Sequence, residues 1–272
     1  MLYNVKEDTL NINGVSMDYV AFGSGKRTLV LIHGLTLRRV KGTGFGLAAM
    51  YRNFTREFRI YCFDRRRDIP EDYSVRMIGE DIAAAMDILG LKNACVLGVS
   101  QGGMAAQYLA IERPDLVEGL ALGVTLSRSN ETLERVVAEW VQLMEENRLE
   151  EMVKSSFRYN YPAKRLKKYR LLMPLLAMAG KPKNPQEFLR MTKACLTCDT
   201  YDRLGEIKCP VLVLGDRQDM IVTGAASEEI AEKLGCRPVM FDGFGHGAYE
   251  EKPFNDEVYG FFTGELIHHA KE

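Results

Sequence analysis

Two periodicities of apolar and polar residues alternate along the chain. Residues 9–22 alternate with a period of two around Asn13-Gly14, a pair that accepts the positive φ angles of a tight turn, so we predict a β-hairpin. Continuous apolar runs, which suit strands buried on both faces, cover 28–34, 58–64, 93–99, 117–125, 209–216 and 237–243. Apolar residues at helical spacing predict helices over 75–90, 102–114 and 226–235, and a last helix from about Asn255.

The order of these elements indicates the class of fold. Strands and helices alternate with short links, which favours βαβ units and a mostly parallel sheet of the α/β class. The alternation stops over 128–205, where we predict several helices and no strand. Because no repeat or low-complexity linker separates this block, we interpret it as a helical cap inserted into one core domain, 1–127 and 206–272. Such insertions commonly sit over the carboxyl ends of the strands, where open α/β sheets hold their sites.

The inserted block 128–205 carries three signals of its own. Its leucine and methionine side chains, such as those in 171–176, are expected to pack mostly against the core domain, and some of them could line an acyl pocket. The basic cluster "KRLKKYR" (164–170) is interpreted as a solvated helix face, with a patch that attracts anionic substrates as the alternative. Cys195-x-x-Cys198 has no second Cys or His pair at zinc spacing, and we interpret it as two incidental thiols.

Composition narrows the classes of partner. The 272 residues are 46% apolar and 27% charged, which is ordinary for a globular protein. The 36 basic and 37 acidic residues nearly cancel, so neither nucleic acid nor a membrane is expected as a partner. No apolar run reaches the roughly 18 residues of a membrane span, and the N-terminus lacks the apolar segment of a signal peptide. We therefore expect a cytoplasmic protein with reduced cysteines.

A Gly-x-Ser-x-Gly pentapeptide, "GVSQG", stands where a predicted buried strand gives way to a predicted helix. Gly98 and Gly102 permit a sharp chain reversal that leaves Ser100 exposed at its tip. The N-terminus of the following helix favours negative charge developing on a carbonyl oxygen bound there. With 24 glycines in the chain the bare pattern could arise by chance, but its position between strand and helix predicts that Ser100 is a nucleophile.

A serine hydroxyl needs a base to become a good nucleophile. Among the four histidines, His268 and His269 belong to a polar C-terminal tail, where we expect them to be solvated. His246 stands between glycines in the loop after the last predicted strand, from which it can reach a cleft at the carboxyl edge of the sheet. We predict that His246 is the general base.

The base in turn needs an acid that orients it, and three aspartates are candidates. Asp216 follows a predicted strand directly, and Asp219 stands three residues further along the loop, where it can approach the imidazole. We favour Asp219 as the orienting acid and interpret Asp216 as a structural turn residue. Asp242 is the third candidate, and we expect it to cap the loop that carries His246.

The order Ser100, Asp219, His246 makes the resemblance to a known family specific. The segments "LVLIHGL", "CFDRRR", "GVSQGG", "CPVLVLGDRQD" and "GFGHGAYEEKP" resemble those of the α/β-hydrolase fold family, over nearly the whole chain. The resemblance implies a mostly parallel central sheet with an antiparallel N-terminal hairpin, helices on both faces and a helical cap. A serine at the turn argues against the dehalogenase and epoxide-hydrolase branches, which use an aspartate there.

The resemblance also implies roles for residues around the serine. His33 and Gly34 would shape the loop after the third strand, and the backbone N–H groups of Leu35 and Gln101 would form the oxyanion hole. No metal and no organic cofactor are implied. The segment "FDRRRDIPEDYS" (63–74) is more charged than the corresponding loop of the family, and we interpret it as a surface variation near the cleft.

These observations predict a serine hydrolase that cleaves a small carboxylic ester, or a thioester, through an acyl-enzyme intermediate. The partner would be a small-molecule ester-type substrate. Neither the fold nor the triad fixes the substrate, so an acyltransferase, an aminopeptidase or a C–C bond hydrolase with the same triad stays open. A protein that binds small molecules on the same fold without catalysis is a further alternative.

Overall fold

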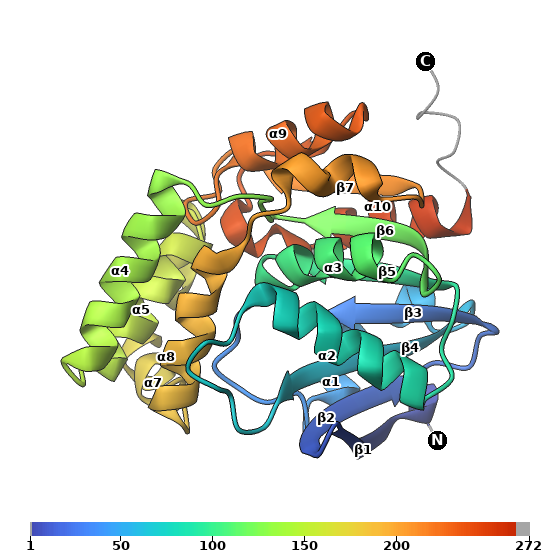
Figure 1. Ribbon diagram of the computed structural model, residues 1–272. Coiled ribbons are helices and arrows are strands. Elements are labelled where there is room, and N and C mark those ends of the chain that lie inside the picture. The colour runs from blue at the N-terminus through green and yellow to red at the C-terminus, as the bar shows by residue number, and fades with distance from the viewer. Residues whose placement is uncertain (1, 265–272) are drawn as a thin grey trace.

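A mixed sheet of eight strands runs through the middle of the molecule, in the order β1-β2-β4-β3-β5-β6-β7-β8 (Figure 1). The computed structural model describes residues 2–264, so His268 and His269 lie outside the described residues. The strands are β1 (Lys6–Ile12), β2 (Val15–Phe22), β3 (Arg27–Ile32), β4 (Phe58–Arg66), β5 (Ala94–Val99), β6 (Val117–Gly123), β7 (Val211–Asp216) and β8 (Val239–Phe241).

The predicted hairpin is formed by β1 and β2, which pair antiparallel up to the Ile12–Val15 pair beside the turn. Asn13 and Gly14 adopt φ angles of 51° and 86°, the left-handed conformation that a two-residue hairpin turn requires. β2 also pairs antiparallel with β4, whereas every pair from β4 through to β8 is parallel. The predicted fold class is therefore confirmed.

Helices cover both faces of this sheet. The α-helices are α1 (Gly44–Met50), α2 (Val75–Ile88), α3 (Gln101–Glu112), α4 (Glu131–Glu145), α5 (Leu149–Asn160), α6 (Ala163–Tyr169), α7 (Met173–Ala179), α8 (Pro185–Ala194), α9 (Gly224–Leu234) and α10 (Lys252–Thr263). Short 3-10 helices lie at η1 (Leu2–Asn4), η2 (Arg52–Phe54), η3 (Cys195–Thr197), η4 (Tyr201–Glu206) and η5 (Gly245–Glu250). Among the described residues, no helix is long and apolar enough to cross a bilayer.

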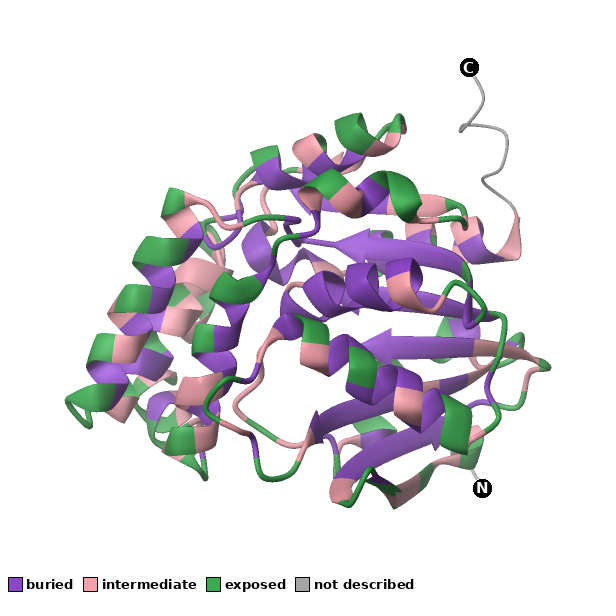
Figure 2. Cartoon of the chain, in the orientation of Figure 1, coloured by how far each residue is buried: buried purple, intermediate pink, exposed green. Residues whose placement is uncertain are grey.

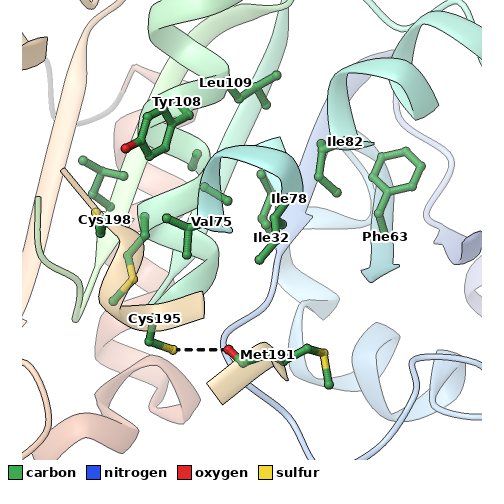
Figure 3. Packing of buried hydrophobic residues seen from close by; sticks show 14 of the residues in the cluster. Ile32, Phe63, Val75, Ile78, Ile82, Tyr108, Leu109, Met191, Cys195 and Cys198 are labelled. Atoms are coloured by element: carbon green, nitrogen blue, oxygen red, sulfur yellow. Dashed lines mark hydrogen bonds between the residues drawn. The ribbon is translucent and has the colours of Figure 1, made fainter. Parts of the chain in front are cut away.

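Alternate residues of the central strands supply two separate cores. Val30 and Ile32 of β3 pack with α2 and α3 on one face of the sheet, in the cluster that Figure 3 shows around Ile32, Ile78 and Ile82. Leu29 and Leu31 point to the other face, where α1 and α10 cover them. Because successive side chains of a strand point to opposite faces, a strand with both faces covered is apolar throughout. Figure 2 shows the central strands buried along most of their length.

The helices α4 to α8 form a group of their own beside the sheet, and the arrowheads of β3 and β6 point toward it (Figure 1). The two ends of this block meet, because Arg128 and Asp199 form an isolated antiparallel bridge and the Thr200 amide donates to the Ser127 carbonyl at 2.7 Å. The chain thus leaves the sheet and returns to it at one place. Helix α1 was not predicted, because its short glycine-rich sequence gives little helical periodicity.

The expectation that the leucines and methionines of the block pack mostly against the core domain is wrong for α7 and the turn before it. Leu171 is 88% exposed, and Leu172, Leu175 and Met178 are each more than half exposed. The physical reason is that α7 is a single short helix with neighbours on one side, so that only Ala177 of its residues is buried.

Candidate active site

Ser100 lies between the last residue of β5 and the first residue of α3, in a conformation that non-glycine residues rarely adopt (φ 53°, ψ −125°). The glycines around it are required by close backbone contacts. A Cβ atom on Gly98 would lie 2.6 Å from the Gly102 carbonyl oxygen, and one on Gly102 would lie 2.0 Å from the Ile32 carbonyl oxygen. The turn therefore holds the serine rigidly at the carboxyl edge of the sheet.

His246 lies in η5, after β8, and its side chain is buried between Ser100 and Asp219. Its Nε2 is 2.9 Å from Ser100 Oγ, and its Nδ1 is 2.8 Å from Asp219 Oδ2. The other oxygen of Asp219 accepts hydrogen bonds from the Ile221 and Val222 amides, at 2.8 and 3.1 Å. With Nδ1 protonated toward the carboxylate, Nε2 is left to accept the serine proton.

The two other aspartates considered from the sequence do not contact His246. Asp216 accepts hydrogen bonds from the Gln218 and Phe244 amides at 2.8 and 2.9 Å, so its carboxylate joins the loops after β7 and β8. Asp242 is exposed and accepts from the Gln218 side chain at 2.7 Å. The structure thus gives Asp216 the turn role that the sequence predicted and brings only Asp219 to the imidazole.

Two backbone segments that could bind an oxyanion lie beside Ser100. Gln101 is the first residue of α3, so its N–H is one of the helical amides without an intrahelical acceptor. Leu35 lines the same cavity as Ser100, in the loop after β3. Gly34 brings that loop against the serine, since a Cβ at Gly34 would lie 3.0 Å from Ser100 Cβ.

The segment 63–74 is not a surface variation at its start, and that interpretation is wrong for Asp64 and Arg65. These two residues are 2% and 1% exposed. Arg65 Nη2 donates to the His33 carbonyl at 2.6 Å and to Gln101 Oε1 at 3.2 Å. The guanidinium therefore joins the two segments that flank Ser100. The sequence signal that could have indicated their burial was the position of both charged residues at the end of an apolar run, where β4 is still buried.

The side chain of Gln101 continues this network into the helical block. Its Nε2 donates to the Met191 carbonyl at 2.6 Å and to Cys195 Sγ at 3.2 Å. Cys195 and Cys198 point into the buried cluster of Figure 3, and both are free thiols. Burial raises the pKa of Cys195 to about 11 and that of Cys198 to about 12, so both stay protonated at neutral pH.

A cavity of about 550 Å³ opens at Ser100 and His246, between the carboxyl edge of the sheet and the helical block. Apolar side chains of that block line much of it: Leu133, Val137, Trp140, Met152, Phe157 and Leu176. A largely apolar cavity with a few polar groups is typical of small-molecule sites. Among the described residues, no group of three or more His, Cys, Asp or Glu side chains could hold a metal ion.

The basic cluster 164–170 lies on α6, which leaves its lysines exposed. Arg165 differs from them. It forms an ion pair with Glu251 at 2.7 Å and lies over the Tyr161 ring, with its guanidinium carbon 5.0 Å from the ring centre. Because neither Lys167 nor Lys168 lines the cavity at Ser100, the cluster has the geometry of a solvated helix face.

His33 is held as a neutral imidazole beside the cavity. Burial, together with the positive charge of Arg65, lowers its pKa from 6.5 to about 4. Between these two values the unfolded chain binds a proton that the folded protein does not, so stability falls as the pH falls through this range. The free energy of unfolding should fall between pH 7 and pH 5 in the unsubstituted protein. In His33→Gln we expect this fall to be smaller by about 2 kcal/mol. Urea denaturation at the two pH values measures this, and an equal loss in both proteins would contradict it.

Comparison with known proteins identifies the family to which the fold belongs. The family model of the alpha/beta hydrolase fold matches residues 27–253, and the chain belongs to that family. A relative from Caulobacter sp. (strain K31), named "Putative carbamate hydrolase RutD", is 28% identical and covers 89% of this chain and 92% of its own. A relative of the same name from Rhizobium rhizogenes is 26% identical over 86% of this chain and 92% of its own.

Solved structures show the same fold at lower identity. The alpha/beta hydrolase MGS-M2, from a Medee basin deep-sea metagenome library, superimposes with a TM-score of 0.82 at 20% identity and covers 94% of this chain and 97% of its own. The enol-lactonase from Burkholderia xenovorans LB400 gives a TM-score of 0.79 at 20% identity, over 94% of this chain and 100% of its own. At this identity the likeness concerns the fold.

Proposed function

We propose that this protein hydrolyses a small carboxylic ester, or a thioester, through an acyl-enzyme formed on Ser100. The observation that carries the proposal is the continuous hydrogen-bonded chain from Asp219 through His246 to Ser100, which ends at an apolar cavity. Each member supplies what the next one lacks. The carboxylate orients the imidazole, the imidazole accepts the hydroxyl proton, and the hydroxyl oxygen attacks.

The reaction would run in two halves. As Ser100 Oγ attacks the carbonyl carbon, its proton passes to His246 Nε2, and Asp219 stabilises the imidazolium that forms. His246 then gives the proton to the departing alcohol or thiol, which leaves the acyl group on Ser100. A water molecule, deprotonated by the same Nε2, attacks the acyl-enzyme and releases the acid. The serine recovers its proton at the end, so the cycle consumes one water and needs no other reactant.

The oxyanion formed in each half would be bound by the N–H groups of Gln101 and Leu35. The Gln101 amide lies at the positive end of the α3 dipole, which favours negative charge at that point. Arg65 supports both donors indirectly, because it binds the His33 carbonyl and the Gln101 side chain. Loss of one such donor in other enzymes costs about 10²–10³-fold in rate.

Carbamate hydrolysis is the second candidate, and the name that the curated relatives carry favours it. The same three side chains could act on a carbamate, because Ser100 would attack its carbonyl carbon in the same way; the carbamate differs in carrying nitrogen in place of carbon on the acyl side of that carbonyl. Ester hydrolysis is preferred here because the cavity at Ser100 has a largely apolar lining, which suits an acyl chain better than a small polar carbamate.

A panel of p-nitrophenyl esters of graded acyl length, assayed beside a p-nitrophenyl carbamate, tests the proposal. We expect the esters to be hydrolysed with an optimum at short to medium chains, and more slowly as the chain outgrows the cavity.

Other results would indicate other functions. Faster turnover of the carbamate would favour the second candidate. An added alcohol that outcompetes water for the acyl group would indicate an acyltransferase. A folded protein that hydrolyses no panel member and no peptide, and does not react with a fluorophosphonate, would indicate a binding protein.

A further inference from the structure

A second cavity adjoins the first at the loop after β3. It measures about 410 Å³ and shares nine lining residues with the cavity at Ser100, among them His33 and Gly34. The two cavities differ in the charge of their walls. The second is lined by six cationic side chains and only two carboxylates, those of Asp64 and Glu187. The cationic side chains are Arg38, Arg39, Lys41, Arg65, Lys181 and Lys183.

Both carboxylates of this wall are already engaged. Glu187 and Asp64 lie 2.6 and 3.5 Å from the guanidinium of Arg39, and Asp64 also accepts a hydrogen bond from the Val40 amide at 2.9 Å. Lys41 and Lys181 have acidic neighbours outside the cavity wall, at 3.8 and 3.2 Å. The cavity therefore offers a bound molecule more positive charge than its own acids balance.

Arg38 and Lys183 are exposed, and neither forms an ion pair with another described residue. They come from different parts of the chain, Arg38 from the loop after β3 and Lys183 from the segment between α7 and α8. Two cations that line one cavity without acidic partners repel each other weakly. An anion bound near both would offset this repulsion.

Arg65 adds a buried positive charge behind them. Its two hydrogen-bond acceptors, the His33 carbonyl and the Gln101 side-chain oxygen, are both neutral. Within the described residues its Nη1 has no hydrogen-bond partner, although the side chain is only 1% exposed and lines this cavity. The neighbouring Asp64 carboxylate offsets part of this charge, but the unsatisfied N–H of Arg65 can still donate to a further acceptor, and a negatively charged one is favoured.

We propose that the second cavity is a subsite for an anionic group of the substrate, a carboxylate or a phosphate, while the reacting carbonyl lies at Ser100. This inference rests on the proposed ester hydrolysis and specifies its substrate class as acidic esters. Arg38 and Lys183 bind the anion directly, and Arg65 strengthens the positive potential from within the fold. The shared loop from His33 to Arg39 places the two cavities within reach of one small molecule.

Matched substrate pairs test the subsite. The first pair is p-nitrophenyl hexanoate and mono-p-nitrophenyl adipate, in which a terminal carboxylate replaces the methyl end of the acyl chain. The second is ethyl 4-(hexanoyloxy)benzoate and 4-(hexanoyloxy)benzoate, in which the charge is on the leaving group. An acyl chain that ends in a phosphonate distinguishes phosphate from carboxylate. We expect at least one anionic member to exceed its neutral partner by about tenfold in kcat/KM, through a lower KM, and salt to reduce this ratio.

Variants distinguish binding of the anion at the subsite from a general effect of positive charge on the protein surface. Arg38→Gln and Lys183→Gln should each lower the ratio of anionic to neutral kcat/KM severalfold, and the double variant about tenfold. Lys164→Gln is the matched control, because Lys164 is an exposed lysine of the same block that lines neither cavity, and it should leave the ratio unchanged.

Two outcomes would overturn the subsite while the proposed hydrolysis stands. In the first, neutral esters are hydrolysed as well as anionic ones. In the second, Lys164→Gln lowers the ratio of anionic to neutral kcat/KM as much as Lys183→Gln does. A binding measurement keeps the two proposals apart. Calorimetric titration of Ser100→Ala with adipate and with a phosphonate needs no catalysis. Binding that Arg38→Gln and Lys183→Gln weaken would support the subsite even if no ester were hydrolysed, and no binding of either anion would contradict it.

Discussion

Replacing Ser100 with alanine is expected to lower kcat for the best p-nitrophenyl ester by about 10⁴–10⁶-fold. The hydroxyl oxygen is the atom that becomes acylated, and among residues 2–264 His246 Nε2 has no other serine within hydrogen-bond distance that could replace it. Any residual rate would come from binding and the oxyanion donors alone. Stopped-flow or extended steady-state assays measure the rate, and mass spectrometry of protein treated with a fluorophosphonate measures the loss of labelling.

The matched control for this substitution is Ser156→Ala. Ser156 lines the same cavity, but its hydroxyl donates to the Val153 carbonyl at 2.8 Å, one turn back on its own helix. The control should keep kcat and fluorophosphonate labelling within about twofold, because among the described residues the Ser156 hydroxyl bonds only within its own helix and to no member of the triad. If Ser100→Ala kept most of its activity, or if labelling fell on another residue, Ser100 would not be the nucleophile.

Replacing Asp219 with asparagine is expected to lower kcat by about 10⁴-fold with little loss of stability. The asparagine oxygen can still accept from the Ile221 and Val222 amides, which preserves the loop. Its NH₂ group, however, would donate to His246 Nδ1 and leave the ring proton on Nε2. The imidazole would then present a donor to Ser100, so it could not accept the hydroxyl proton. Kinetics together with a thermal melt of each protein separate this effect from unfolding.

Asp242→Asn serves as the control for Asp219→Asn, because Asp242 is exposed and contacts only the Gln218 side chain among the described residues. It should keep nearly full activity. A large loss in Asp242→Asn with little effect in Asp219→Asn would reverse the assignment of the acid. Asp216 is unsuitable as a control, since its carboxylate accepts two backbone hydrogen bonds that join neighbouring loops.

Much of the fold could be predicted from the sequence because the relevant signals are local. A strand covered on both faces must be apolar throughout, which marked β3 and β5, and the hairpin turn needed a pair such as Asn13-Gly14. The turn at Ser100 was equally local, because a strand, two glycines and a helix start follow one another there. The pairing of His246 with Asp219 was harder, since it depended on choosing among three aspartates, two of them only three residues apart.

The features that the sequence did not reveal depend on contacts between distant segments. Arg65 and Gln101 are 36 positions apart, and Gln101 and Met191 are 90 positions apart. The apolar run before Arg65 could indicate that this residue is buried, but not which acceptors satisfy it, because those come from elsewhere in the chain. The error at α7 is of the opposite kind, because its leucines were expected to be buried and are exposed. An apolar pattern indicates which face of a helix would be buried, but not whether another element covers that face.

The Gln101 side chain also bears on how a substrate could reach Ser100. It ties the residue next to the nucleophile to the Met191 carbonyl and Cys195 at the end of α8, in a fully buried position. Lifting α8 would break these hydrogen bonds and disturb the turn at Ser100. By contrast, α6 buries none of its residues and α7 only one, so separating them from the molecule exposes little new apolar surface. We therefore expect α8 to stay in place, and a substrate to enter the cavity by displacement of α6 and α7.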